Sequence, residues 1–573
     1  MIQEAHKAAR KSLFANLPVG RSFDVRAVLI VSALLAAGCV LWIQHLRVAT
    51  DTGGLSPIFF VLFSVFDYRA AQLALALLLL ALFVPRWGGF DRVLRLLGEH
   101  PILVGLVVTI ILALGTLFIY RNQPLSMDEY APFFQSRVFA TGHLAGKFPL
   151  DLLNCLVPVS DQNTFLNVSK STGEVSSAYW PSFALLLTPF TMLGVPWVCN
   201  PVLSGITIIV LNRLALRLFD NVEAAGFVTL LTLASPVFFA DGISYYSMTS
   251  HMCANALFAL LVLEPSFRRL FVAGIVGSIA LTLHNPVPHI LFAVPWFVWL
   301  ARRERPFAHL AVLWAGYLPL SIVLGIGWFL HSGELTHSGS PVAANAGTLE
   351  SLTSAFVLPS WPLLYARLVG LAKVLLWASP CLIVLAVAGA RRRRSDSRFA
   401  ALAACGLLTF VGYLFFWPDQ GHGWGFRYFH SAWLVLPLLG TAFLFVPAGE
   451  SSPAGSADLR AYVVACALLS LFAGVGLRAS QIGEFMANHL GQLPRYGGTE
   501  PRIVVLTGIG FYPLDLVQND PFLRDDVVRM IDYGTGACTA AINRHFPSYS
   551  AVYRDRFGSV WSAATPSLPT IGK

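Results

Sequence analysis

Long uncharged runs of apolar residues constrain this chain more than any other feature. The run from Pro101 to Tyr120 holds no charged side chain, and similar runs recur along the sequence. A helix needs roughly 20 mostly apolar residues to cross the hydrocarbon core of a bilayer. Charged residues make up 12% of the 573 residues and hydrophobic residues 56%, whereas an average soluble protein is about 25% charged. We therefore predict an all-α, polytopic membrane protein.

About 13 membrane crossings are predicted from these runs, with ends uncertain by several residues. They cover residues 26–44, 70–86, 101–120, 200–218, 222–240, 246–263, 269–284, 286–300, 308–330, 365–388, 398–416, 425–446 and 459–477. The tripeptide His284-Asn285-Pro286 divides one long apolar stretch into two of these crossings.

The basic residues predict the orientation of the crossings, because Lys and Arg gather in cytoplasmic loops. The net charge of +9 is therefore interpreted as topology and not as nucleic-acid binding. The clusters are the N-terminus, Arg86/Arg92/Arg95, Arg213/Arg217, Arg268/Arg269, Arg302/Arg303/Arg305 and Arg391 to Arg394. Alternation then places residues 121–178, 241–250, 331–360 and 417–424 outside. If segment 180–198 crossed the membrane fully, every later basic cluster would be placed on the outer side. We therefore predict a half-span or an interfacial segment there.

Two regions follow from the change in composition near residue 478. Residues 1–477 are predicted to form the transmembrane domain, with 121–178 as a large first external loop. Residues 478–573 are mixed and polar, and Arg502 to Leu506 alternate in a way that predicts a strand. We expect a small C-terminal α/β region outside the membrane, after a Gly/Ser/Pro-rich loop at 448–457.

Eight cysteines are scattered along the chain, and six of them fall in or beside apolar runs. Cys155 and Cys538 lie in polar stretches, and the spacing leaves their pairing open. No CxxC motif and no His/Cys cluster predicts a zinc site. No metal ligand is assigned, although dependence on a divalent metal stays open.

An acidic pair, Asp128 and Glu129, follows the uncharged run of residues 101–120. Ser126 and Glu129 have the spacing of a capping box, and the negative charge of Asp128 would interact favourably with the dipole at the start of a helix. Pro132 lies where such a helix would already donate backbone hydrogen bonds, which argues against a long regular helix. On spacing alone, a structural cap and a functional site are equally good interpretations.

The residues after the acidic pair favour a function. Phe133, Phe134, Val138 and Phe139 alternate with the polar residues Gln135, Ser136, Arg137 and Thr141. This pattern is typical of an amphipathic helix in a membrane interface. A carboxylate between such a helix and a transmembrane helix can reach both water and a lipid-linked substrate, which suits a general base.

The order of motifs resembles the GT-C superfamily of integral-membrane glycosyltransferases, which includes protein O-mannosyltransferases and lipid A aminoarabinose transferases. The motifs are "SMDEY", the aromatic-rich segment ending in "GHL", "AYWPSFALLLTPFTMLG", "NRLALRLFDNVEAAGFVTLLTLASPVFF" and "YYSMTSHMCANALFALLVL". They cover about residues 100–300 well and 417–440 more loosely.

The resemblance implies an inverting transferase that moves a sugar from a polyprenyl-phosphate-linked donor to an acceptor on the outer face of the membrane. Asp128 would be the general base, and Glu129 would support it or position the acceptor. The acceptor class, whether a glycan, a lipid or a protein, stays open, as does the sugar. A bacterial inner membrane is the expected location.

A leaving phosphate needs positive charge or hydrogen-bond donors beside it. The stretch "SSAYWPSF" holds no basic residue, and Lys170 is out of register. The segment Asp419 to His430 offers glycines for close approach of the backbone, and we predict that Arg427, His422 and Tyr428 bind the donor phosphate. The structural alternative is that Arg427 snorkels while Trp424, Tyr428 and Phe429 form an aromatic belt.

Five further residues are predicted to line a substrate cavity: Tyr179, Trp180, Asp241, His251 and His284. Ionisable groups at membrane depth are candidates for function. A histidine bonded to a neighbouring helix is an equally good interpretation of His251 and His284, and a plain loop aspartate is the commoner outcome for Asp241.

Two functions of other classes compete with an enzyme. A transporter or flippase for a lipid-linked substrate would favour charges inside the crossings, paired broken helices and internal symmetry, and the sequence indicates few such charges. A non-catalytic scaffold whose tail binds a partner leaves the surroundings of Asp128 unexplained.

Overall fold

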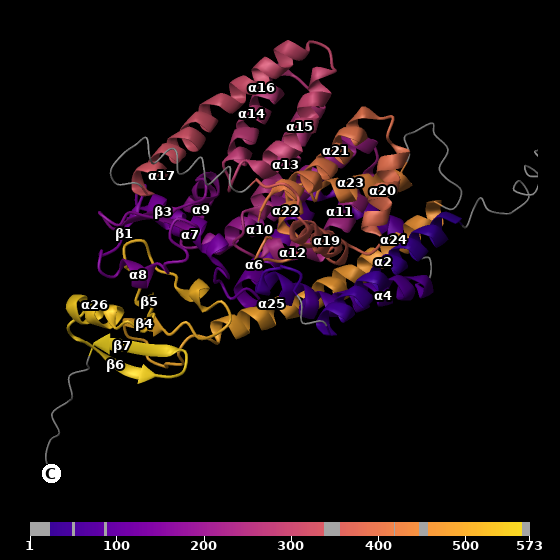
Figure 1. Cartoon of the computed structure of the whole chain (residues 1–573). Helices are drawn as coiled ribbons and strands as arrows, with labels where there is room; N and C mark the ends of the chain where they lie inside the picture. Colours follow the sequence, from indigo (N-terminus) through magenta and orange to yellow (C-terminus); the bar gives the residue numbers. More distant parts are fainter. Residues whose placement is uncertain are drawn as a thin grey trace, which may run out of the picture.

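A computed structural model describes residues 23–48, 52–84, 89–336, 356–417, 419–445 and 456–563. Within them, a large helical body carries two small sheets at one end (Figure 1). Several sequence-based predictions lie outside the described residues. These are the basic N-terminal segment before Phe23, Arg86, most of the predicted external segment 331–360, and residues 448–455 of the Gly/Ser/Pro-rich loop.

The helices before the large loop are α2 (Phe23–Val48), α3 (Pro57–Val61), α4 (Asp67–Leu80), α5 (Gly89–Glu99) and α6 (Pro101–Phe118). The loop and its exit contain α7 (Met127–Ala140), α8 (Leu153–Leu156) and α9 (Ser182–Met192). The central helices are α10 (Cys199–Phe219), α11 (Val222–Leu233), α12 (Pro236–Gly242), α13 (Met248–Leu263), α14 (Phe267–Leu281), α15 (Val287–Ala301), α16 (Pro306–Leu320) and α17 (Trp328–Thr336). The last group is α19 (Trp361–Leu376), α20 (Leu382–Arg392), α21 (Ser397–Gly412), α22 (Arg427–His430), α23 (Val435–Leu444), α24 (Ser456–Leu469), α25 (Val475–Leu490) and α26 (Ala537–His545).

Seven helical segments of the described chain are long and apolar enough to cross a membrane, or eight if one bent pair is a single span. They are Arg26–Val48, Pro57–Phe83, Pro101–Phe118, Pro196–Phe219, Pro306–Thr336, Ser397–Phe415 and Ala457–Leu490, and the bent pair is α11 with α12, at 67°. This confirms a polytopic helical membrane fold. The full set of 13 crossings stays a prediction, because other predicted crossings form shorter apolar helices.

Several predicted crossings differ from the helices that form, and two of them show why. The crossing predicted at 70–86 begins at Pro57, because the charged side chains of Asp67 and Arg69 interrupt the hydropathy without interrupting the helix. The crossing predicted at 365–388 is divided into α19 and α20. Cys381, which precedes α20, has a left-handed backbone conformation with φ of 70°.

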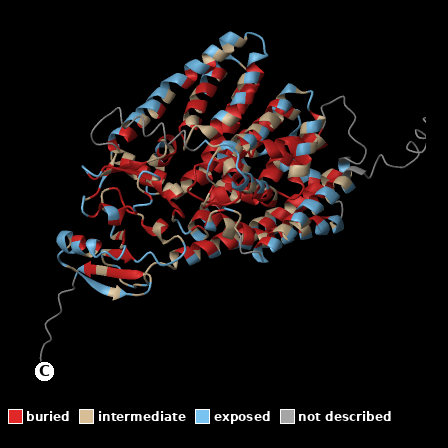
Figure 2. Cartoon of the chain, in the orientation of Figure 1, coloured by how far each residue is buried: buried red, intermediate tan, exposed pale blue. Residues whose placement is uncertain are grey.

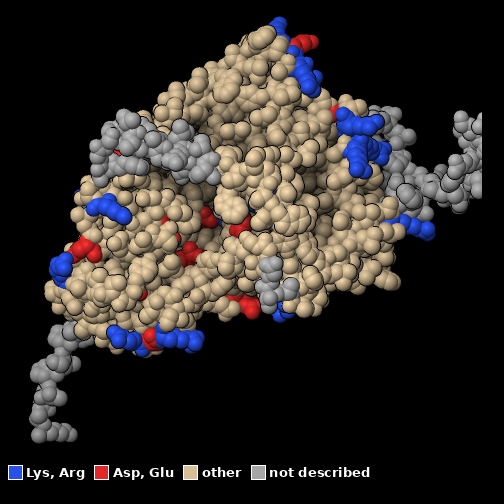
Figure 3. Space-filling view, viewed as in Figure 1, with Lys and Arg blue, Asp and Glu red and all other residues tan. Residues whose placement is uncertain are grey.

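The outer faces of the long helices are apolar. On α6, Ile102, Leu106, Ile110 and Leu114 are all about half exposed or more, as the pale blue outer surfaces of the helical body illustrate (Figure 2). Charged side chains are sparse on the face seen in Figure 3 and gather toward its ends. Contiguous exposed apolar surface of this extent is typical of contact with lipid.

Segment 180–198 forms the 11-residue helix α9 and a short turn, Pro196–Val198. At 1.5 Å per residue, α9 rises roughly 16 Å, about half the hydrocarbon thickness. Its length therefore fits the predicted half-span.

Two small sheets lie beside the helical body. The first is antiparallel in the order β1-β3-β2 and belongs to the large loop; its strands are β1 (Gly146–Lys147), β2 (Leu166–Val168) and β3 (Glu174–Ser177). The second has the order β5-β4-β7-β6, with β4 (Arg502–Leu506), β5 (Val527–Ile531), β6 (Tyr549–Arg554) and β7 (Gly558–Ala563). The strand predicted at 502–506 is confirmed as β4.

The C-terminal region is attached to the large loop by covalent and ionic contacts. Cys155 and Cys538 form a disulfide with Cα atoms 6.0 Å apart, which answers the question that the spacing left open. Arg544 and His545 both contact Asp151, with the Nη1 and Nε2 atoms 2.5 and 2.6 Å from its carboxylate. Helix α25 continues past the predicted boundary at 477/478 to Leu490, and the C-terminal unit, residues 491–563, follows it.

Candidate functional site

The acidic pair occupies the first turn of α7, which begins at Met127. Ser126 stands at the N-cap, but its hydroxyl lies 3.0 Å from the hydroxyl of Tyr246 and makes no cap bond. The capping-box interpretation is therefore wrong for this helix. The expectation that Pro132 would prevent a regular helix is also wrong, because α7 continues for 14 residues with Pro132 inside it. A proline cannot donate one backbone hydrogen bond of the helix. The burial of Pro132 together with the residues around it in α7 offsets that loss.

Glu129 is fully buried and accepts three hydrogen bonds. Its donors are the backbone N–H groups of Leu125 and Tyr245, at 2.5 and 2.8 Å, and the hydroxyl of Tyr120, at 2.9 Å. Burial raises the pKa of Glu129 to about 7, although these three donors act in the opposite direction. Glu129 thus ties the large loop to the turn before α13, and it does so without reaching the surface.

Helix α7 is largely enclosed by protein. The polar residues Gln135 and Ser136, predicted for a solvated face, are both 0% exposed. Gln135 donates to the carbonyl of Leu144 and accepts from the backbone of Ser177, so its amide holds the loop sheet against the helix. The expectation of a solvated polar face is therefore wrong for Gln135 and Ser136, because α9 and the loop sheet pack against α7. The position of α7 in a membrane interface stays a prediction.

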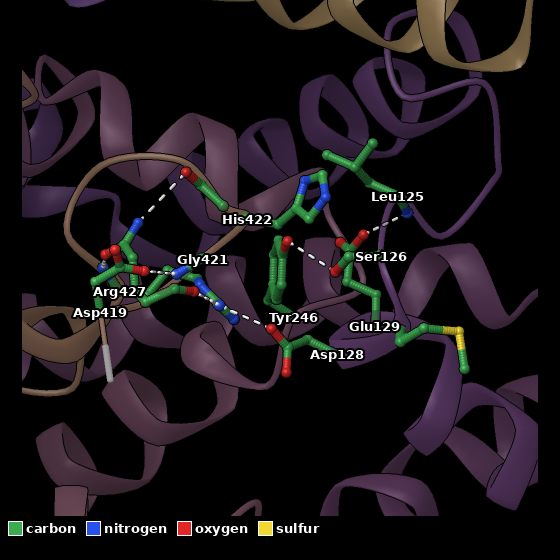
Figure 4. A network of polar contacts seen from close by, with 12 residues as sticks. Leu125, Ser126, Asp128, Glu129, Tyr246, Asp419, Gly421, His422 and Arg427 are labelled. Carbon is green, nitrogen blue, oxygen red and sulfur yellow. Dashed lines mark hydrogen bonds and ion pairs between the residues drawn. The ribbon is translucent and has the colours of Figure 1, made fainter. Parts of the chain in front are cut away.

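Asp128 meets Arg427 although 299 positions separate them. The Oδ2 atom of Asp128 lies 2.8 Å from Nη2 of Arg427, and its Oδ1 atom accepts a hydrogen bond from the hydroxyl of Tyr179. Figure 4 shows the guanidinium pointing at the carboxylate, with Tyr246 beside it. Burial alone would raise the pKa of Asp128, but Arg427, His284 and Tyr179 together lower it below its ordinary value. The carboxylate is therefore ionised at neutral pH, and 19% of its side chain stays exposed.

The glycine-rich segment before α22 holds Arg427 in place. The side-chain amide oxygen of Gln420 accepts a hydrogen bond from the backbone of Arg427 at 2.8 Å. The guanidinium also lies 4.4 Å above the ring of Tyr246, a cation–π contact. Gly423 has φ of +120°, and a Cβ atom there would come within 2.4 Å of Arg427 Cδ. Any other residue at 423 would displace the arginine, which explains why glycine is needed.

The structural alternatives for this segment are excluded by burial. Arg427 is 6% exposed, whereas a snorkelling arginine extends into water. Trp424 and Phe429 are 2% and 7% exposed, so they do not form an aromatic belt at a lipid surface.

Tyr179 and His284 lie next to Asp128, and Trp180 is joined to His284. The rings of Tyr179 and His284 lie 4.0 Å apart between centroids. The backbone N–H of Trp180 donates to the carbonyl of His284, and the indole of Trp328 donates to the carbonyl of Tyr179. Burial raises the pKa of Tyr179 well above its ordinary value, and the neighbouring Asp128 carboxylate raises it further. Tyr179 therefore stays protonated and donates to Asp128.

His422 contacts the C-terminal unit and does not share the contacts of Arg427. Its Nε2 atom is 2.9 Å from Oδ2 of Asp515. The other carboxylate oxygen of Asp515 accepts the backbone N–H of Met127 at 3.1 Å. One aspartate therefore contacts both the first turn of α7 and the segment that carries Arg427. Sequence reasoning did not find Asp515, because a single aspartate in a polar region carries no signal.

Tyr428 contacts a second arginine that sequence reasoning missed. The guanidinium of Arg367 lies 5.0 Å from the ring centroid of Tyr428, and the ring of Tyr413 stacks parallel to that of Tyr428 at 4.4 Å. Arg367 also donates to the carbonyl of Tyr413 at 2.7 Å. A lone arginine within the apolar run "WPLLYARLVGLAK" was the available signal.

Asp241 and His251 lie deeper and do not contact Asp128. Oδ2 of Asp241 is 2.9 Å from Nδ1 of His430, and both side chains are sealed. His251 is 0% exposed, and neither of its ring nitrogens has a hydrogen-bond partner among the described residues. The interpretation of His251 as a histidine bonded to a neighbouring helix is therefore wrong for the described residues.

Within the described ranges, no group of three or more His, Cys, Asp or Glu side chains is placed to hold a metal ion.

Comparisons with known proteins give a likeness of structure only. No family model matches the chain, and no curated protein matches its sequence. Among solved structures, the chain is similar to ArnT from Cupriavidus metallidurans, in a crystal structure bound to undecaprenyl phosphate and in one in the apo state. The TM-score is 0.48 in both cases, with 12% and 13% sequence identity, and the match covers 80% of this chain and 97% of ArnT.

Proposed function

We propose that this protein is a membrane glycosyltransferase that takes a sugar from a polyprenyl-phosphate-linked donor. The observation that carries the proposal is the ion pair between Asp128 and Arg427, one partly exposed and one buried, on two segments distant in the sequence. A base for an acceptor hydroxyl and a cation for a leaving phosphate are the two groups that such a transfer requires.

In the proposed reaction, the Asp128 carboxylate accepts the proton of the acceptor hydroxyl. The acceptor oxygen forms a bond to the anomeric carbon of the sugar as the bond from that carbon to the phosphate oxygen breaks. The electron pair of the broken bond leaves with the polyprenyl phosphate, and the configuration at the anomeric carbon is inverted.

Arg427 has a double use in this scheme. Before the donor binds, it holds the pKa of Asp128 low, which makes the carboxylate a weak base. A donor phosphate that takes over the Arg427 guanidinium would remove part of that stabilisation and raise the basicity of Asp128 when the sugar is in place. Arg367, on the far side of Tyr428, would add positive charge beside the same segment.

The outer face of the membrane is the proposed side of the reaction. The large loop and the C-terminal unit share the Cys155–Cys538 disulfide, so both lie on one side of the membrane. Disulfides persist in oxidising compartments such as the bacterial periplasm. A bacterial inner membrane with Asp128 facing that compartment agrees with both points.

Transfer of radiolabelled sugar from a polyprenyl-phosphate donor, measured in membranes that hold the full chain, tests the proposal. Asp128→Asn keeps the shape of the side chain, and we expect transfer to fall roughly 10²- to 10⁴-fold, the usual contribution of a general base. Glu174→Gln, a half-buried loop carboxylate away from Arg427, is the matched control and should transfer normally.

Full transfer by folded Asp128→Asn protein would show that the base is misassigned. The transporter or flippase alternative predicts a different outcome, in which labelled donor crosses the bilayer of proteoliposomes and no sugar is transferred.

A further inference from the structure

A cavity of about 300 Å³ lies between α7 and the C-terminal unit. Its lining includes Tyr130, Phe133 and Arg137 from one side and Asp525, Asp526 and Arg529 from the other. Its volume is at the lower end of the range for small-molecule sites, which begins near 300 Å³.

The cavity lies on the opposite side of α7 from Asp128. Tyr130, Phe133 and Arg137 are spaced three and four residues apart, so they share one face of the helix. At 3.6 residues per turn, Asp128 projects from the other side. The cavity is thus separate from the pair of Asp128 and Arg427, and the thickness of one helix divides them.

Two charged groups in the lining have unused hydrogen-bonding capacity. Arg137 is already bound by Asp525 and Asp520, with the shortest contacts at 2.5 and 3.0 Å. By contrast, the Arg529 guanidinium donates one side-chain hydrogen bond within the described residues, a 3.5 Å bond to the carbonyl of Leu516, although Tyr130 and Asp525 are close enough to interact with its charge. The Asp526 side chain is exposed and has no ion-pair partner in the same described part of the chain.

These groups select for a hydroxylated ligand. A guanidinium only donates hydrogen bonds and a carboxylate only accepts them, so a ligand that satisfies both must do both, as a sugar hydroxyl does. Two arginines and two aspartates in the lining leave no net charge, which disfavours an anion. The rings of Tyr130 and Phe133 belong to the lining, with the Arg137 guanidinium 5.8 Å from the ring centroid of Phe133. The C–H groups of a pyranose pack against aromatic rings, whose faces have negative character.

We propose that this cavity binds one sugar unit of a carbohydrate, with Arg529 and Asp526 holding its hydroxyls. Binding of a sugar unit in the cavity does not depend on the proposed transfer reaction. The identification of this unit as part of an acceptor glycan does rest on that reaction. Because α7 separates the cavity from Asp128, the unit bound here would not be the reacting one, and it would hold an extended acceptor in position.

Saturation-transfer NMR on the purified full chain tests the proposal, in a detergent without a sugar headgroup. The probes are free glucose, mannose, galactose and N-acetylglucosamine and their β-linked disaccharides. We expect at least one probe to receive saturation, and we expect binding to weaken at least tenfold, about 1.4 kcal/mol, in Asp526→Ala and in Arg529→Ala. Asp526 is exposed, so the first variant folds even if the second does not.

Arg524→Ala is the matched control, because Arg524 is an exposed arginine in the same segment whose guanidinium lies 4.9 Å from the ring of Phe522 and does not line the cavity. It should bind as the unchanged protein does, and so should Asp128→Asn. Absence of binding by every sugar probe would overturn the proposal, as would binding that survives in Asp526→Ala and folded Arg529→Ala. Binding of inorganic phosphate in place of the sugars would identify an anion site and would also overturn it.

The two proposals fail separately. Sugar binding that depends on Asp526, together with full transfer by Asp128→Asn, would keep the cavity and reject the base. Loss of transfer in Asp128→Asn without any sugar binding would do the reverse.

Discussion

Asp67 and Asp128 each form a close ion pair with an arginine, but their surroundings differ. Asp67 contacts Lys373 and Arg478, both at 2.7 Å, and accepts the indole N–H of Trp377 at 2.8 Å. The three charged side chains are no more than 1% exposed, and they join the span Pro57–Phe83 to α19 and α25. Asp128 contacts one arginine and keeps 19% of its side chain exposed.

The difference shows how the same pairing serves two purposes. A sealed carboxylate with two cations cannot exchange partners, and its contacts connect three helices in the part of the molecule that meets lipid. A carboxylate that is partly exposed, with one cation, can lose that partner to an incoming anion. Accessibility, and not the presence of an ion pair, therefore distinguishes the candidate site from the sealed cluster of Asp67, Lys373 and Arg478.

The largest effect is expected for Asp67→Asn, which leaves two cations buried beside a neutral amide. Breaking a buried ion pair by removing one partner costs about 3–5 kcal/mol. We expect little folded protein and a strongly lowered midpoint of thermal unfolding, measured by size-exclusion chromatography after heating in detergent. Asp128→Asn, measured in the same way, should lower the midpoint less, because Arg427 keeps its hydrogen bond to the carbonyl of Gln420 and its contact with the ring of Tyr246.

A triple variant sharpens the comparison further. Asp67→Leu with Lys373→Met and Arg478→Met replaces the sealed cluster with apolar groups, an exchange that is often neutral or stabilising. It should fold and transfer sugar normally. A folded triple variant without transfer would mean that the sealed cluster has a function beyond joining helices.

The sealed cluster also shows where sequence reasoning stopped. One predicted crossing began at residue 70, so Asp67 fell just outside it. The last predicted crossing ended at residue 477, so Arg478 fell just outside that one. A prediction from hydropathy ends a span at the first charged residue. The helix itself continues past that residue when an opposite charge on another helix neutralises it. Lys373 lay inside a predicted crossing, but its partner was unknown without the fold.

At the candidate site, local signals located the right segments but not their contacts. The acidic pair and the glycine-rich segment at 419–430 were both singled out, and the structure places Asp128 against Arg427. The motif "SMDEY" could not show that Asp128 stays partly exposed while Glu129 is fully buried. Adjacent residues of a helix face different neighbours, and those neighbours are known only from the fold. The partner of His422 is Asp515, which lies in the C-terminal unit and has no sequence pattern that connects it to the glycine-rich segment.

Glu129 extends the comparison to a buried carboxylate with no cation within ion-pair distance in the described residues. Burial raises its pKa from 4.5 to about 7. As pH rises above 4.5, the unfolded chain releases this proton while the folded protein keeps it, so folding stability falls until the folded group also ionises near pH 7. The stabilisation lost over this window is on the order of 3 kcal/mol, at about 1.4 kcal/mol per pKa unit.

The unfolding midpoint of the unchanged protein should therefore decrease between pH 5 and pH 8, and Glu129→Gln should remove much of that decrease. The glutamine cannot accept all three hydrogen bonds, so its midpoint is lower overall, and the pH dependence is the informative quantity. Glu174→Gln is the control, since Glu174 is only half buried. Parallel curves for Glu129→Gln and the unchanged protein would show that Glu129 is ionised in the fold at all these pH values.

The smallest effect is expected for Asp515→Asn, a positioning residue that touches neither partner of the pair formed by Asp128 and Arg427. Its carboxylate links the backbone of Met127 to His422, and so it sets how α7 stands relative to the segment of Arg427. We expect kcat for sugar transfer to fall about tenfold, the equivalent of about 1.4 kcal/mol, which is the size of the net contribution of one hydrogen bond. The KM for the donor should change little, because Arg427 keeps its own contacts with Gln420 and Tyr246.

A double-mutant cycle separates positioning from a general loss of structure. If Asp515 acts through His422, then His422→Ala and Asp515→Asn together should cost little more than either alone, because each removes the same contact. Asp532→Asn changes another acid of the C-terminal unit, one that accepts a hydrogen bond from Gly534, and should leave kcat unchanged. Fully additive losses in the cycle would mean that Asp515 and His422 affect the site independently, and the pair of Asp128 and Arg427 would then be held by α7 and the glycine-rich segment alone.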